Sequence, residues 1–172
     1  MAKSDTNRRH PNVLNLNEVT PYEIDKGRFS ATVKQLGAGT GGQLMGCNWI
    51  DVPPGRSAFP CHFHCATEEV IFVLDGEGTL RLGPDRVQVS AGDFITFPPG
   101  PDHAHRLDNT GASPLRYLCL SNKVHADVVG YPDSNKFAAT GSPSVHFFNK
   151  PWVRAIFRTD TVIDYYDGEV TD

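Results

Sequence analysis

The sequence predicts an all-β domain whose antiparallel strands form a sandwich or barrel, and three observations lead to this expectation. The chain has 172 residues, a length that suits one compact domain with its own apolar core. Its 16 glycines and 13 prolines favour many short strands and turns over long helices. From residue 43 onward, apolar segments alternate with turn signals at intervals of roughly 8 to 12 residues.

The strands expected in the middle of the chain follow one another closely. Most are bounded by Gly, Pro, Asp or Asn, the residue types that tight turns require. The turn at 53–55 reads Pro-Pro-Gly, and the turn at 75–78 reads Asp-Gly-Glu-Gly. The expected strands are 43–52, 68–74, 79–83, 86–90, 93–98, 104–109 and 115–121, so the core of the barrel should span about 43–122.

The flanking segments are less periodic. Residues 1–20 are expected to form an N-terminal tail or arm, with 21–172 as a single domain. Residues 13–19 and 22–36 alternate loosely, as edge strands or a packing arm would. The glycine-rich stretch 36–42 lacks the lysine and Ser/Thr of a phosphate loop and is expected to be a plain loop. After residue 122 we expect surface loop with a short helix near 124–129, then a closing acidic and aromatic segment.

Charge and cysteine content exclude several classes of partner. The formal net charge is -4, so neither nucleic acid nor an anionic membrane is an expected partner. No apolar run approaches the ~18 residues of a membrane span, and we expect a soluble, cytoplasmic protein. The four cysteines fall outside zinc-finger spacing and are expected to be reduced: Cys47, Cys61, Cys65 and Cys119.

A group of histidines and a glutamate predicts one metal site. His62 and His64 are two residues apart, so they point to the same side of an extended segment, and Glu69 has matching parity on the next strand. His103 and His105 share one parity further along, and one of them is expected to complete the site. Imidazole and carboxylate ligands together suit a divalent transition metal: Mn, Fe, Co, Ni, Cu or Zn.

The prediction depends on the whole group of residues. An isolated H-x-H pair in a strand is more often hydrogen-bonded or solvent-facing than metal-binding. The downstream glutamate, the second histidine strand and the glycine turns between them favour the metal. Cys61 and Cys65 flank the pair with odd parity, so they are expected to point away from the ion.

These residues resemble the two motifs of the cupin superfamily. The first motif, a glycine, H-x-H, a glutamate and a second glycine, matches Gly55, His62, His64, Glu69 and Gly76, with one extra residue after the first glycine. The second motif, a glycine, P-x-G, a histidine and an asparagine, matches Gly92, Pro98, Gly100 and Asn109. Counting from Gly100 selects His103, and counting back from Asn109 selects His105. Similarity to small cupins, which keep the H-x-x-x-N end, favours His105.

The resemblance implies a fold and a cofactor class. It implies a small single-domain (monocupin) protein with a double-stranded β-helix or jelly-roll barrel, an N-terminal arm and a C-terminal loop and short-helix segment. It also implies three histidines and one glutamate around a metal, and a homodimer paired through N-terminal strands. The superfamily includes dioxygenases, isomerases, epimerases, lyases, decarboxylases, storage proteins and sensors, so the fold does not identify the reaction.

Alternation along two strands indicates a substrate pocket. Met45, Cys47 and Trp49 share one face of their strand, and Tyr117 lies on a face of another. These side chains line either an apolar, aromatic pocket or an ordinary barrel core. A pocket of this kind suits a small organic acid, sugar or aromatic compound. The closing "YYDG" at 165–168 is expected to cover the barrel mouth or to pack as an arm.

Two function classes follow from a metal with open coordination positions. The first is an enzyme, either an isomerase or epimerase acting on a sugar or hydroxy-carbonyl compound, or a dioxygenase. His103 is the candidate general acid or base for the isomerase. The second class is a non-catalytic protein that binds or senses a small molecule through the metal.

Overall fold

The computed structural model describes residues 10–142 and 151–170, and most of its regular structure is β-strand. One antiparallel sheet contains the strands that form the long wall of the domain. In spatial order they are β1 (Tyr22–Lys26), β2 (Phe29–Gln35), β3 (Met45–Val52), β10 (Leu115–Asn122), β5 (Glu69–Asp75) and β8 (Phe94–Phe97).

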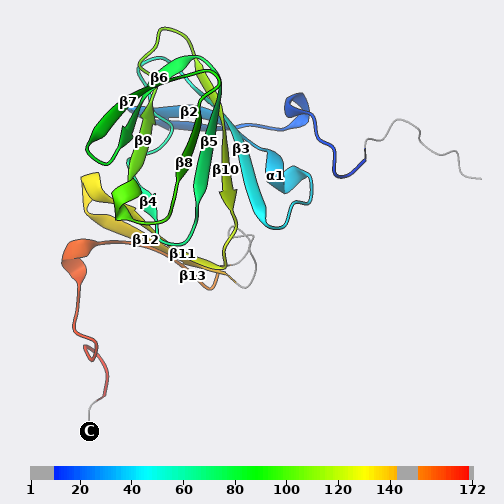
Figure 1. Ribbon diagram of the computed structural model, residues 1–172. Coiled ribbons are helices and arrows are strands. Elements are labelled where there is room, and N and C mark those ends of the chain that lie inside the picture. Colours follow the sequence, from blue (N-terminus) through cyan, green and yellow to red (C-terminus); the bar gives the residue numbers. More distant parts are fainter. Residues whose placement is uncertain (1–9, 143–150, 171–172) are drawn as a thin grey trace, which may run out of the picture.

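Two smaller sheets complete the jelly roll and lie at different ends of the domain (Figure 1). The three-stranded sheet contains β7 (Asp85–Ser90), β6 (Glu77–Leu82) and β9 (His105–Asp108). The four-stranded sheet contains β13 (Val153–Arg158), β12 (Lys136–Gly141), β11 (Ala126–Tyr131) and β4 (Phe63–His64).

Helices are few and short. α1 (Leu36–Gly39) is one turn long. The 3-10 helices are η1 (Leu16–Glu18), η2 (Pro101–His103), η3 (Pro132–Ser134) and η4 (Thr159–Thr161). None of the helices in the described part of the chain has the length and apolar composition needed to cross a membrane.

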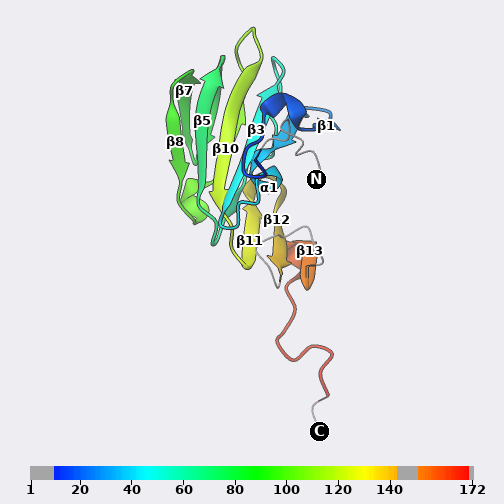
Figure 2. The same cartoon turned by 90° about the vertical axis from the view of Figure 1, so that its right-hand side faces the viewer.

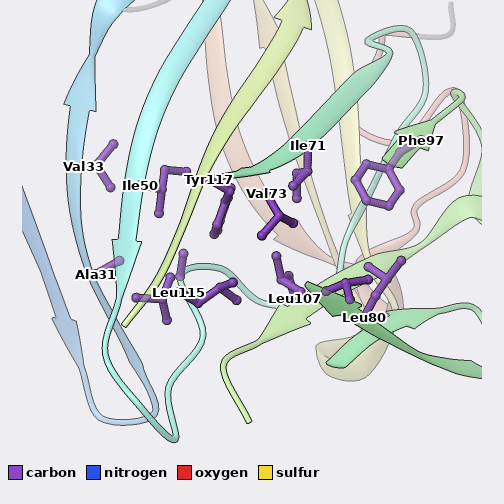
Figure 3. Close-up of a cluster of buried hydrophobic side chains, with 13 residues drawn as sticks. Ala31, Val33, Ile50, Ile71, Val73, Leu80, Phe97, Leu107, Leu115 and Tyr117 are labelled. Carbon is purple, nitrogen blue, oxygen red and sulfur yellow. The ribbon is translucent and has the colours of Figure 1, made fainter. Parts of the chain in front are cut away.

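The apolar core lies between the six-stranded and three-stranded sheets (Figure 3). Ile50 on β3, Val73 on β5 and Leu115 on β10 are fully buried, and Leu80 on β6 and Leu107 on β9 face them from the other side. Burying each such side chain contributes about 1.5–3 kcal/mol. Among the described residues, this core cluster includes no member of the four-stranded sheet.

Two motif residues have clear structural roles at the core end. Gly76 adopts φ +85°, and a Cβ there would lie 2.5 Å from the carbonyl oxygen of Pro114, so both the backbone and the contact require glycine. Asn109 is buried; its Nδ2 donates to the carbonyls of Val52 and Ser113, and its Oδ1 accepts from the Gly111 amide. The asparagine therefore joins β3 to the loop before β10.

The structure confirms every strand expected between residues 43 and 121, and β1 forms the predicted edge of a sheet. At the N-terminal side, residues 16–18 form η1 in place of a strand, which leaves the packing arm as the alternative that fits, and the plain loop predicted for the glycine-rich stretch was wrong because it includes α1. The first nine residues of the predicted arm lie outside the described residues.

The predicted loop and helix at 124–129 are also wrong, because residues 126–131 form β11 and pair with β12 and β4. β-branched Val128 and Val129 suit a strand, and Gly130 leaves room for the Phe63 ring. The "YYDG" segment does not cross the barrel mouth. It extends away from the sheets with Tyr165 85% exposed (Figure 2).

Candidate metal centre

Three imidazole rings converge on one carboxylate oxygen. Glu69 Oε2 lies 3.3 Å from His62 Nε2, 3.3 Å from His105 Nε2 and 3.5 Å from His64 Nε2. A reciprocal pair of backbone hydrogen bonds, His62 N–H to His105 O and His105 N–H to His62 O, holds the two histidine segments side by side. Candidate ligand atoms of His62, Glu69 and His105 all lie within 4.8 Å of one another.

The other nitrogen of each ring faces an oxygen acceptor. His62 Nδ1 is 2.9 Å from the carbonyl of Pro60, and His105 Nδ1 is 3.0 Å from the carbonyl of His103. His64 Nδ1 is 2.6 Å from Asp127 Oδ2. These contacts place the ring proton on Nδ1, so a neutral ring directs the Nε2 lone pair toward Glu69. Lone pairs facing a carboxylate repel it unless a cation or proton lies between them.

Asp127, on β11, is the functional residue that the sequence analysis missed. Its side chain is buried, and its Oδ1 accepts from the backbone amides of Cys65 and Ala66 while Oδ2 orients His64. Burial raises the pKa of Asp127, but these hydrogen bonds outweigh burial and lower it. The only sequence signal was an acidic residue before two valines. Because this segment was interpreted as a loop, the sequence did not predict which way the side chain of Asp127 points.

The electrostatics of the cluster favour a charged Glu69 carboxylate beside a neutral His105 ring. Burial raises the pKa of Glu69, yet hydrogen bonding to the three histidines holds it well below the usual range. Burial lowers the pKa of His105. Burial also raises the pKa of Cys119 well above its usual value, so this thiol keeps its proton and donates to Glu69 Oε1 over 3.8 Å. An anionic oxygen beside imidazole nitrogens is a donor set that fits a transition metal.

Two cavities meet at Glu69. The larger has a volume of about 520 Å³ and lies between the inner face of the six-stranded sheet and the four-stranded sheet. His64, Glu69 and Tyr131 form part of its wall. The smaller, about 30 Å³, lies on the core side of His62, Glu69 and His105. The cluster therefore separates the packed core from an accessible space.

The structure distributes the predicted pocket residues unevenly. Cys47 lines the large cavity, and Tyr117 lines the small one. Within the described ranges, Met45 and Trp49 line neither cavity; Met45 is 53% exposed, and Lys34 Nζ lies 5.7 Å from the Trp49 ring centroid. Fully buried Ile50 and Val52 show that the even-numbered residues of β3 face inward, so the parity assigned to this strand was wrong.

His103 does not continue the alternation of its strand. It ends η2, and β9 begins only at His105, so the shared parity expected for the two histidines does not apply. Its carbonyl accepts from His105, but within the described residues its side chain lines neither cavity. A catalytic role for His103 stays a prediction. All four cysteines are free; Cys61 is buried and Cys65 is exposed.

The comparisons with known proteins agree with this fold. Residues 48–121 match the family described as "Cupin domain". Quercetin 2,3-dioxygenase from Bacillus subtilis is 35% identical over 107 residues, which is 62% of this chain but only 31% of that protein, so the match covers less than a third of the relative's length.

Two solved structures match over most of the chain. A protein from Acidithiobacillus ferrooxidans assigned as a sugar phosphate isomerase has a TM-score of 0.77 and 24% identity, over 90% of this chain and 96% of that one. A sugar phosphate isomerase from Silicibacter pomeroyi has a TM-score of 0.74 and 20% identity, over 90% and 98% of the two chains. The family match over residues 48–121 and the jelly-roll fold shared with these structures show a cupin domain in this chain.

Proposed function

We propose that this protein binds one divalent transition metal through His62, His64, Glu69 and His105, and that it is an enzyme of the isomerase or epimerase type. The observation that carries the proposal is the convergence of three Nε2 atoms on one half-buried carboxylate oxygen at 3.3–3.5 Å. An ion between them would satisfy lone pairs that otherwise repel one another. When bound, it would polarise a carbonyl or hydroxyl group of the substrate.

The protein groups around the cluster support small polar substrates. Asp127 keeps the His64 ring in one orientation, and the Cys119 thiol holds the second oxygen of Glu69. The large cavity reaches the cluster beside His64 and Glu69, so a substrate entering it meets that end of the site first. The overall similarity to two proteins assigned as sugar phosphate isomerases supports a sugar-like hydroxy-carbonyl substrate.

A dioxygenase is the second candidate function. The 35% identity with quercetin 2,3-dioxygenase over 107 residues is the observation that favours it. The same ligand set is compatible with iron, nickel or copper and dioxygen. A non-catalytic binding protein is the third candidate, because ligand sets and cavities of this kind also serve binding alone.

The test compares two reactions catalysed by one purified protein. Metal-loaded protein is assayed for interconversion of aldose and ketose phosphates by NMR, and for oxygen uptake with flavonols in an oxygen electrode. Isomerisation that is lost in His64→Ala and kept in His10→Ala, an exposed control histidine, is the expected result. Oxygen uptake without isomerisation would favour the dioxygenase. Tight binding without turnover would favour the binding protein.

A further inference from the structure

The inward-facing side chains of β3 are apolar in the core and become polar where the strand borders the large cavity. Val52 and Ile50 are fully buried in the core, and the next residue on the same face is Asn48, which lines the cavity. Asn48 pairs in register with Cys119, the residue whose thiol contacts Glu69. A carboxamide at this position is close to the metal cluster along the sheet.

Two polar side chains on this wall form no side-chain hydrogen bond to the described part of the protein. Across the described residues, neither the Asn48 carboxamide nor the Ser121 hydroxyl forms a hydrogen bond to protein, and Ser121 pairs in register with Glu69. On the facing sheet, the hydroxyls of Tyr131 and Thr140 are likewise without a protein hydrogen bond in the described ranges. Unpaired polar groups cost free energy when they are desolvated, so an apolar ligand would bind poorly here. A ligand rich in hydroxyl groups would satisfy both walls.

The charged side chains that line the cavity favour an anionic ligand. Both of its carboxylates are engaged by histidines: Glu69 by the cluster and Asp127 by His64. The Lys123 ammonium donates to the carbonyl of Gly42 at 2.7 Å, a neutral acceptor, and an ammonium has further N–H donors. Lys123 forms no ion pair with any described residue, and Arg154, on β13 of the facing sheet, also lines the cavity.

We infer that the large cavity binds a polyhydroxylated anion, with Asn48 and Ser121 binding hydroxyl groups beside the metal cluster and Lys123 binding the anionic end. The inference that the reacting end of the ligand lies at the metal cluster rests on the proposed function. A cavity of about 520 Å³ has room for a ligand of the size of a monosaccharide phosphate. A phosphate and a carboxylate share the chemistry that Lys123 recognises.

Calorimetric titration with three matched probes tests the inference. Glucose 6-phosphate and gluconate carry the two kinds of anion, and glucose carries none. The native protein should bind at least one anionic probe about tenfold more tightly than glucose, since a charged group adds roughly this much through one ammonium contact. Lys123→Met should remove that difference, and Asn48→Leu should weaken the binding of charged and neutral probes alike.

Matched controls separate the site from general effects on folding. Lys34→Met is the control lysine, because its Nζ also donates to a carbonyl, that of Leu16, but lines neither cavity. Gln88→Leu on β7 is the control for Asn48. Lys123→Arg keeps the charge and should keep the preference for anions.

Three results would overturn the inference: equal binding of glucose and the anions, an unchanged preference in Lys123→Met, or unchanged binding in Asn48→Leu. Metal content is measured for each variant in parallel. A native protein without metal that still prefers the anions would refute the metal proposal and leave this inference standing. A native protein that contains metal but does not prefer the anions would refute this inference and leave the metal proposal standing.

Discussion

The two ends of the same three strands differ in what their inward-facing side chains do. At the core end, Ile50, Tyr117 and Val73 form one row across β3, β10 and β5, and all three are almost completely buried. Two steps further along in the same direction, the row is Gly46, Ser121 and Glu69, and it faces the large cavity. The strands, the register and the face are the same.

What differs is the sheet opposite. The three-stranded sheet supplies Leu80 and Leu107 to the packed end, whereas the four-stranded sheet supplies Tyr131 and Thr140 to the open end. Burial of apolar surface stabilises the first end, and polar groups that face a cavity contribute little to the second. Stability and metal binding should therefore be separable by substitutions a few residues apart on one strand.

The largest expected effect is on stability at the packed end. Leu115→Ala removes a fully buried side chain and should lower the free energy of unfolding by about 2–5 kcal/mol, with the metal stoichiometry of the folded protein unchanged. Chemical denaturation followed by circular dichroism measures this. Leu74→Ala is the control, since Leu74 is 41% exposed. A loss of metal from folded Leu115→Ala would show that the two ends are not separable.

A smaller effect is expected for the residue that orients His64. Asp127→Asn weakens the acceptor for His64 Nδ1, and a change of this kind next to a metal ligand costs about 10–100-fold in metal affinity. Competition with a chromogenic chelator gives the affinity. Asp133→Asn, in the adjoining turn, is the control, because the Asp133 carboxylate binds Arg81. This variant should keep the metal affinity of the native protein. Equal metal affinities for Asp127→Asn and the native protein would show that Asp127 does not contribute to the metal site.

Per pH unit, the smallest effect is a pH dependence at the open end. In the metal-free protein burial lowers the pKa of His64, while hydrogen bonds to Asp127 and Glu69 raise it, with a net rise to about 9. A metal at Nε2 must displace this proton, so the apparent affinity should increase about tenfold per pH unit below that pKa and level off above it. Chelator competition from about pH 7 to 9 measures the slope, which Asp127→Asn should flatten. A flat profile in the native protein would contradict this.

Sequence patterns predicted the packed end better than the open end. The strands between 43 and 121 alternate strongly and end in turn residues. Glu69 and His105 lie on two of these strands, and the H-x-H spacing indicated the other two candidate ligands, His62 and His64. The four-stranded sheet could not be predicted, because six of the twelve residues of β11 and β12 are Ala, Gly or Thr, which leaves little apolar alternation in the sequence. Asp127 was missed with them.

Two other errors have local causes. The large Trp49 ring was assigned to the interior of β3, but it lies on the outer face near Lys34, and the smaller Asn48 faces the cavity. The turn η2 interrupts the alternation before β9, which spacing alone does not reveal and which separates His103 from His105. The homodimer implied by the resemblance stays a prediction.

Metal stoichiometry tests the central claim most directly. Elemental analysis of the natively purified protein should find about one transition-metal ion per chain. Glu69→Gln removes the charge on which three imidazole nitrogens converge, and it should contain almost no metal while its circular dichroism spectrum stays native. A native protein that binds no transition metal even after reconstitution, or a folded Glu69→Gln variant that binds it equally well, would contradict the account.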